Sequence, residues 1–158
     1  MTAIGDSAGG GLALAVAMSL RDSGLPRPAR LVLLAPWLDL ALTNPDIAAV
    51  ERLDPSLNRA GLVEAGRVWA GGADPADPRL SPLHGELGGL PPIEVHVGTH
   101  DILYPDTLLL RDRAGAAGTE VTLHVTPGAF HVHVLAPVPE GREARDRIVA
   151  GLPTAGRG

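Results

Sequence analysis

The segment IGDSAGGGLALAVAMSL, residues 4–20, joins a glycine-rich turn to a long apolar run. Gly5, Ser7 and Gly9 form a G-x-S-x-G pattern, which is typical of a serine that stands on a sharp turn between a strand and a helix. Glycine is expected on both sides of the serine, because side chains there would collide where the strand and the helix pass close together. The run 12–20 is apolar on every side, which predicts a buried helix after the turn.

Downstream of this turn the chain alternates between predicted strands and predicted helices. Short apolar runs bounded by turn residues predict strands at 31–35, 93–97 and 121–125. Helices are predicted, from proline and glycine signals and from an amphipathic pattern, at 59–69, 105–117 and 140–152. This order predicts the α/β class, with a mostly parallel sheet that is flanked by helices.

The length of 158 residues fits a single domain, which we place at residues 1–152. The stretch 73–92 is rich in proline, glycine and aspartate and predicts a loop. It is not a domain boundary, because the same alternation resumes after it. Residues 153–158 are predicted to form a disordered tail.

Composition excludes several classes of function. The net charge of −5 and an aromatic content of 3% argue against nucleic acid or an anionic membrane surface as partner. The absence of cysteine excludes disulfides, thiolate metal sites and a cysteine nucleophile. No apolar run approaches the ~18 residues that cross a bilayer, and no secretory signal pattern is visible. We therefore expect a cytoplasmic protein without a membrane span.

Ser7 is the candidate nucleophile. A serine on such a turn stands at the start of a helix, whose first backbone N–H groups stabilise a developing negative charge. The N–H of Ala8 is thus a candidate donor of an oxyanion hole. The alternative is a phosphate-binding turn at a helix N-terminus. The segment has neither the lysine of a P-loop nor the G-x-G-x-x-G spacing of a dinucleotide site, so we favour the nucleophile.

A serine nucleophile needs a base, and the base needs an acid that fixes its tautomer. With a G-x-S-x-G turn, the chain order is serine, acid, histidine, so the partners should lie downstream at the carboxyl ends of strands. Asp101 follows the predicted strand 93–97 and is the candidate acid. Its alternative role is to cap the next helix. Asp106 is the nearest rival, and we expect it to lie inside that helix.

His131 is the candidate base, because it follows the predicted strand 121–125 after a Pro-Gly turn. The other histidines are expected within strands, on the loop surface or beside the site: His84, His96, His100, His124 and His133. His131 and His133 form a His-x-His pair that could suggest a metal site. No further ligand stands at a suitable spacing, so we expect no metal there.

Together these segments resemble the hormone-sensitive-lipase-like family of α/β-hydrolases, the fold-3 branch of carboxylesterases and lipases. The matching motifs are GDSAGG (5–10), LLAPWLDL (33–40), DPRLSPLHGELGGLPP (77–92), GTHDIL (98–103) and PGAFHVH (127–133). The resemblance runs from about residue 4 to about residue 150. It implies the C-terminal half of the fold, about strands five to eight.

The resemblance implies a serine carboxylic-ester hydrolase that acts through an acyl-enzyme, with a small ester as substrate and no cofactor or metal. Ser7, His131 and Asp101 match the positions of the family's triad. Trp37 is expected either to border the substrate pocket or to pack in the core. The family carries an HGGG-type oxyanion segment before the serine, and the printed sequence has none. We therefore expect this chain to be a fragment that lacks the segment.

Two other readings stay open. The chain could be a catalytically inactive, truncated hydrolase-like remnant or interaction module, or the fold could serve a peptidase or an amidase. Whichever holds, the strand before Ser7 would lie at an exposed sheet edge. Exposed edges and apolar patches favour pairing with another chain, so we expect self-association.

Overall fold

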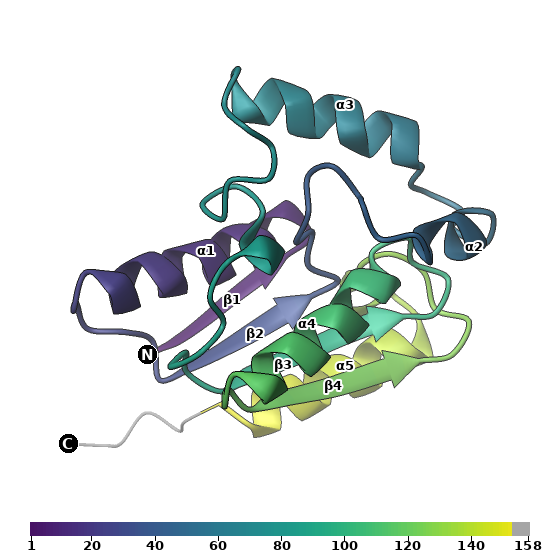
Figure 1. Cartoon of the computed structure of the whole chain (residues 1–158). Coiled ribbons are helices and arrows are strands. Elements are labelled where there is room, and N and C mark those ends of the chain that lie inside the picture. The colour runs from purple at the N-terminus through teal and green to yellow at the C-terminus, as the bar shows by residue number, and fades with distance from the viewer. Residues whose placement is uncertain (153–158) are drawn as a thin grey trace.

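A computed structural model describes residues 1–152 of the chain (Figure 1), so the predicted tail at 153–158 lies outside the described residues. Its sheet has four parallel strands in the order β1-β2-β3-β4. They are β1 (Thr2–Asp6), β2 (Arg30–Leu34), β3 (Ile93–Gly98) and β4 (Val121–Thr126). The predicted α/β class and parallel sheet are confirmed.

Helices connect the strands and lie on both faces of the sheet (Figure 1). They are α1 (Ala8–Asp22), α2 (Ile47–Glu51), α3 (Arg59–Ala70), α4 (Tyr104–Ala116) and α5 (Pro139–Ala150), with short 3-10 turns at Pro82–His84 and His133–Leu135. The predicted helices agree with α3, α4 and α5 to within two residues at each end. The short helix α2 and the two 3-10 turns were not predicted.

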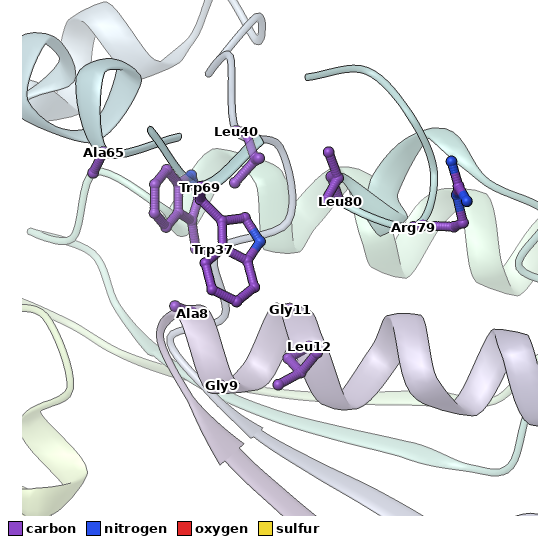
Figure 2. A pocket seen from close by; sticks show the side chains of 10 residues that line it. All are labelled: Ala8, Gly9, Gly11, Leu12, Trp37, Leu40, Ala65, Trp69, Arg79 and Leu80. Carbon is purple, nitrogen blue, oxygen red and sulfur yellow. The ribbon is translucent and has the colours of Figure 1, made fainter. Parts of the chain in front are cut away.

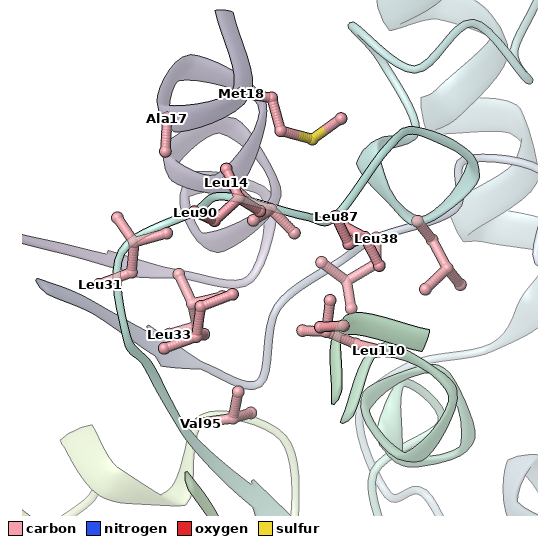
Figure 3. Packing of buried hydrophobic residues seen from close by; sticks show 13 residues of the cluster. Leu14, Ala17, Met18, Leu31, Leu33, Leu38, Leu87, Leu90, Val95 and Leu110 are labelled. Carbon is pink, nitrogen blue, oxygen red and sulfur yellow. The ribbon is translucent and has the colours of Figure 1, made fainter. Parts of the chain in front are cut away.

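The side chains of β2 alternate between two apolar cores. Leu31 and Leu33 face the cluster that α1 and α4 cover, where Leu14 and Leu110 lie over the sheet (Figure 3). The next residues in the strand, such as Val32, face the opposite cluster with α5. All of these β2 side chains are buried, because the strand lies inside the sheet and both of its faces are covered.

The prediction that α1 is buried all round is wrong. Leu14 and Ala17 are fully buried, but Leu12 is 53% exposed and Val16 is 46% exposed. The physical reason is the position of the helix over β1, which is an outer strand of the sheet. Leu12 also lies on the wall of a cavity that α1 shares with α3, so this part of the helix is not fully covered. None of the helices within residues 1–152 is both long and apolar enough to cross a bilayer.

The glycines around Ser7 differ in whether their surroundings leave space for a side chain. A Cβ on Gly5 would lie 2.2 Å from the Gly9 carbonyl oxygen, as predicted for a close strand-to-helix approach. A Cβ on Gly9 would meet only the Asp6 carboxylate at 3.9 Å, so the steric reason given for Gly9 is wrong. The tight contact falls further along α1 instead, where a Cβ on Gly11 would lie 2.1 Å from the Trp37 carbonyl oxygen.

Gly11→Ala should therefore destabilise the protein by about 1–3 kcal/mol, because the added methyl meets backbone that cannot move aside. Gly115→Ala is a matched control, since a Cβ at this helical position meets open space. That control should gain about 0.5–1 kcal/mol, the cost of glycine in a helix relative to alanine. Urea denaturation of both variants measures the difference. Equal stability of Gly11→Ala and the wild type would contradict the packing.

Candidate active site

Ser7 stands between β1 and α1 with a positive φ of 49° and a ψ of −119°. Its backbone is held on both sides: the Ser7 N–H donates to the Leu34 carbonyl at 2.9 Å, and the Trp37 N–H donates to the Ser7 carbonyl at 2.9 Å. A positive φ at a non-glycine residue costs about 1–3 kcal/mol and is found mainly where surrounding structure enforces it, often at functional sites. The local fold therefore fixes the direction in which the Ser7 hydroxyl points.

The structure brings Ser7, His131 and Asp101 together. His131 Nε2 lies 3.0 Å from Ser7 Oγ, and His131 Nδ1 lies 2.9 Å from Asp101 Oδ2. The three residues follow β1, β3 and β4. Because these strands are parallel, their carboxyl ends lie at the same end of the sheet. With Nδ1–H bonded to the carboxylate, the Nε2 lone pair faces the hydroxyl, which is the arrangement that a general base requires.

The Asp101 carboxylate is fully buried and held from two directions. Its Oδ1 accepts a hydrogen bond from the Leu103 N–H at 2.9 Å, while Oδ2 faces His131. The alternative role, a cap of the next helix, is not found, because the N-cap of α4 is Leu103 and no side chain caps it. Asp101 Oδ1 instead holds the loop before α4, and Oδ2 is left for the histidine. A buried carboxylate with hydrogen bonds to both oxygens keeps one orientation.

Asp54 holds the loop that carries Asp101, a role that was not predicted from the sequence. Its Oδ2 accepts a hydrogen bond from the Ile102 N–H at 2.8 Å, and its Oδ1 accepts from the backbone of Ser56 and Leu57. The Asp-Pro-Ser signal at 54–56 indicates a turn. A partner 48 residues away leaves no trace in local sequence, so the contact with the Asp101 loop could not be predicted.

His133, the second histidine of the His-x-His pair, takes no part in the hydrogen bonds between Ser7, His131 and Asp101. The His133 side chain is 1% exposed, and neither ring nitrogen has a hydrogen-bond partner within the described residues. Burial lowers the pKa of His133, an effect that the nearby Asp101 charge opposes. Among residues 1–152, the only group of three ligand-type side chains close enough to share an ion lies on β3 and β4 and includes neither His131 nor His133.

Asp106, the predicted rival acid, lies in the first turn of α4 and is fully buried. Burial raises the pKa of Asp106 to about 6. The Asn44 side chain opposes this rise without making a hydrogen bond of good geometry, and the charge of Asp39 adds to it. The partner of His131 is Asp101 and not Asp106.

Asp106→Asn should stabilise the protein by up to about 3 kcal/mol at pH 7, because a pKa difference of one between the folded and unfolded states corresponds to about 1.36 kcal/mol. Since the folded pKa of Asp106 lies above the unfolded value of 3.8, the native state binds more protons between pH 4 and pH 6. The stability of the wild type should fall as pH rises through this window. Urea titrations at pH 4 and pH 7 measure the effect. A gain that is equally large at pH 4 would contradict this charge-based explanation.

An apolar cavity of about 370 Å³ adjoins the start of α1 (Figure 2). Its walls come from α1, α3 and the loops after β2 and α3: Ala8, Gly9, Gly11, Leu12, Trp37, Leu40, Ala65, Trp69, Arg79 and Leu80. Ala8 and Trp37, both predicted for the site, line this cavity. Trp37 also packs in a core cluster and is only 8% exposed, so one side chain both lines the cavity and packs in the core.

Comparisons with known proteins agree with this architecture. Residues 1–135 match the model of a protein family described as alpha/beta hydrolase fold. An acetyl-hydrolase of Streptomyces hygroscopicus is 42% identical over 157 residues, which cover 98% of this chain and 52% of that protein. An esterase of Acinetobacter venetianus is 35% identical, with 89% of this chain and 47% of that protein covered.

Solved structures give the same result. A crystal structure of an esterase from the bacterial hormone-sensitive lipase family has a TM-score of 0.90 at 40% identity, with 93% of this chain and 50% of that chain covered. A putative esterase from Staphylococcus aureus has a TM-score of 0.93 at 30% identity, with 97% and 52% covered. The chain spans about half the length of the relatives that it matches. As the motifs predicted, it belongs to the α/β-hydrolase fold family and has structural neighbours in the hormone-sensitive lipase branch.

Proposed function

We propose that this chain carries the catalytic triad of a serine carboxylic-ester hydrolase of the esterase and lipase type. The observation that carries the proposal is the hydrogen-bonded series from Ser7 Oγ through His131 to Asp101, at 3.0 and 2.9 Å. Its members come from three strand ends that are far apart in the sequence. The names of the relatives, acetyl-hydrolase and esterase, support an ester as the substrate class.

The reaction follows from the roles of these groups. Ser7 Oγ attacks the ester carbonyl carbon while His131 Nε2 takes the hydroxyl proton, and the Asp101 carboxylate stabilises the resulting imidazolium. The tetrahedral intermediate then expels the alcohol, which receives the proton from His131, and an acyl-enzyme remains. Water gives a proton to His131 and attacks the acyl carbon. Ser7 leaves with that proton, and the carboxylic acid is released.

The Ala8 N–H is the proposed oxyanion donor on this chain. Ala8 is the first residue of α1, where backbone N–H groups have no partner within the helix. The positive end of the helix dipole adds to the stabilisation of the oxyanion. One such donor is worth about 10²–10³ in rate, so the number of donors at this site strongly affects the rate of hydrolysis.

The apolar cavity supports an acyl or alkyl group as the part of the ester that binds beside Ala8. Its walls hold two indole rings, Trp37 and Trp69, and only one charged side chain, Arg79. Burial of apolar surface stabilises binding by about 25 cal/mol per Å², which favours an uncharged substrate group here.

Hydrolysis of p-nitrophenyl acetate and p-nitrophenyl butyrate by the purified chain tests the proposal. We expect ester turnover that exceeds the buffer rate, and no turnover of the matching p-nitroanilides. Turnover of the anilides would instead favour a peptidase or amidase. A folded chain that hydrolyses neither substrate would favour the inactive remnant or interaction module.

We propose further that the isolated chain self-associates through the outer edge of β1 and the neighbouring face of α1. Ile4 on β1 is 49% exposed and stands opposite Val32, on the sheet face away from α1. Leu12 and Val16 of α1 are exposed as well. Light scattering should give a mass above the 16.3 kDa of one chain. Ile4→Lys should lower that mass, because a charge on a strand edge opposes pairing. A monomer with a cooperative melt would contradict the proposal.

A further inference from the structure

A second cluster of chemically active side chains lies on the sheet, on β3 and β4. His96 pairs directly with His124 in the parallel register, and Glu94 stands two residues before His96 on the same face. That face is the one covered by α5, because Glu94 and His96 stand opposite Val32 and Leu34 of β2, which pack on that helix. The catalytic proposal uses none of these three side chains.

The three side chains direct their ligand atoms to one point. Glu94 Oε1 lies 2.7 Å from His96 Nε2 and 3.7 Å from His124 Nε2, and all three atoms lie within 4.8 Å of one another. The two imidazole rings are stacked, with centroids 4.5 Å apart and planes at 28°. A carboxylate oxygen can accept two hydrogen bonds, but His124 Nε2 at 3.7 Å is too far from Glu94 Oε1 to make one.

A neighbouring side chain orients the carboxylate of this cluster. The other Glu94 oxygen, Oε2, is held by Arg30 Nη2 at 2.5 Å, which orients the carboxylate and leaves Oε1 for the cluster. Outer hydrogen bonds of this kind position the ligands in known metal sites.

We propose that Glu94, His96 and His124 bind a divalent transition metal ion of the Zn²⁺ type, with water in the remaining position. Two imidazoles and one carboxylate are a known ligand set for Zn²⁺, with bonds of about 2.0–2.2 Å to nitrogen and oxygen. Ligand atoms in such a tetrahedron stand about 3.3 Å apart, a separation that follows from those bond lengths. The observed 2.7 and 3.7 Å differ from it by about half an ångström, within reach of side-chain rotation.

A cavity beside the cluster gives an ion access from solvent. It is lined by His96 and His124, and on α5 by Glu140, Glu143 and Arg147. The positive charge of Arg147 opposes a cation, whereas the two glutamates of the same helix attract it. The metal would join β3 to β4 across the register pair and would stabilise the folded chain by an amount that grows with the logarithm of its affinity.

Titration of the full, untagged chain with Co²⁺ and Zn²⁺ tests this site. We expect one equivalent of Co²⁺ to give visible absorption of a tetrahedral nitrogen and oxygen site, and Zn²⁺ to abolish it and to raise Tm. His124→Gln and His124→Phe should each weaken binding at least tenfold, because one ligand is lost, and His124→Phe keeps a stacked ring. His84→Gln is the matched control, which removes a histidine outside the cluster and should bind as the wild type does.

Two further variants sharpen the outcome. Arg147→Gln should strengthen binding several-fold, because it removes a nearby positive charge. His131→Gln should leave binding unchanged. Wild-type affinity in both His124 variants, or the absence of any metal-dependent absorption and Tm shift in the wild type, would overturn the proposal. A signal lost in His131→Gln and kept in the His124 variants would place the ion at the triad and also overturn it.

Discussion

Ser7→Ala should lower kcat for p-nitrophenyl esters by about 10⁵–10⁶-fold, because no other group can form the acyl-enzyme. The loss should appear in kcat and leave KM close to the wild-type value, since the apolar cavity beside Ala8 is unchanged. Removal of one hydroxyl also relieves no strain at Ser7, whose positive φ is set by the backbone contacts to Leu34 and Trp37. The folded state should therefore persist, and a melting curve checks it.

Covalent labelling gives an independent measurement of the same prediction. A fluorophosphonate should modify Ser7 in the wild type, as located by mass spectrometry, and should leave the Ser7→Ala chain unmodified. Modification at another serine, or ester hydrolysis that survives the substitution, would remove Ser7 from the proposed role. Ser81 is the natural internal comparison, because it is fully buried and its hydroxyl donates to the Pro75 carbonyl rather than to a histidine.

Asp101→Asn should lower kcat by about 10⁴-fold while the geometry is retained. An amide in place of the carboxylate can donate to His131 Nδ1, which forces the proton onto Nε2 and leaves no lone pair for the Ser7 hydroxyl. The asparagine also cannot stabilise the imidazolium that forms during the reaction. Steady-state kinetics with the same ester substrates measure the loss.

Asp106→Asn is the matched control for this experiment, since it makes the same chemical change five residues along the chain. It should keep kcat within a few-fold of the wild type, because Asp106 makes no hydrogen bond to His131 in the described structure. A larger loss in Asp106→Asn than in Asp101→Asn would reverse the assignment of the acid.

Sequence alone predicted the features that local signals encode. The serine turn, the strand ends before Asp101 and His131, and four of the helices (α1, α3, α4 and α5) follow from glycine, proline and apolar patterns over a few residues. Chain order then limited the candidates for acid and base to residues downstream of Ser7. The three predicted residues do lie together, at the hydrogen-bonding distances given above, and their catalytic roles stay predictions until the kinetics are measured.

The features that sequence missed depend on contacts between distant segments. The apolar pattern of α1 alone does not show that Leu12 is exposed, although the resemblance to half of a fold already implied an exposed edge at β1. The contact of Asp54 with the Asp101 loop spans 48 residues. Likewise His96 and His124 appeared as separate strand residues, because only the register of β3 against β4 makes them neighbours.

β2 contributes no member of the triad, yet it sets the spacing between the members. At its carboxyl end, the Leu34 carbonyl accepts a hydrogen bond from the Ser7 N–H. Just after the strand, the Ala35 N–H donates to the His96 carbonyl of β3, and the Trp37 N–H donates to the Ser7 carbonyl. The length of β2 therefore fixes the distance between the nucleophile Ser7 and the acid Asp101. Among related proteins we expect residues 30–37 to tolerate exchanges of equal volume but no insertion or deletion, whereas the exposed segment 71–74 after α3 can change in length.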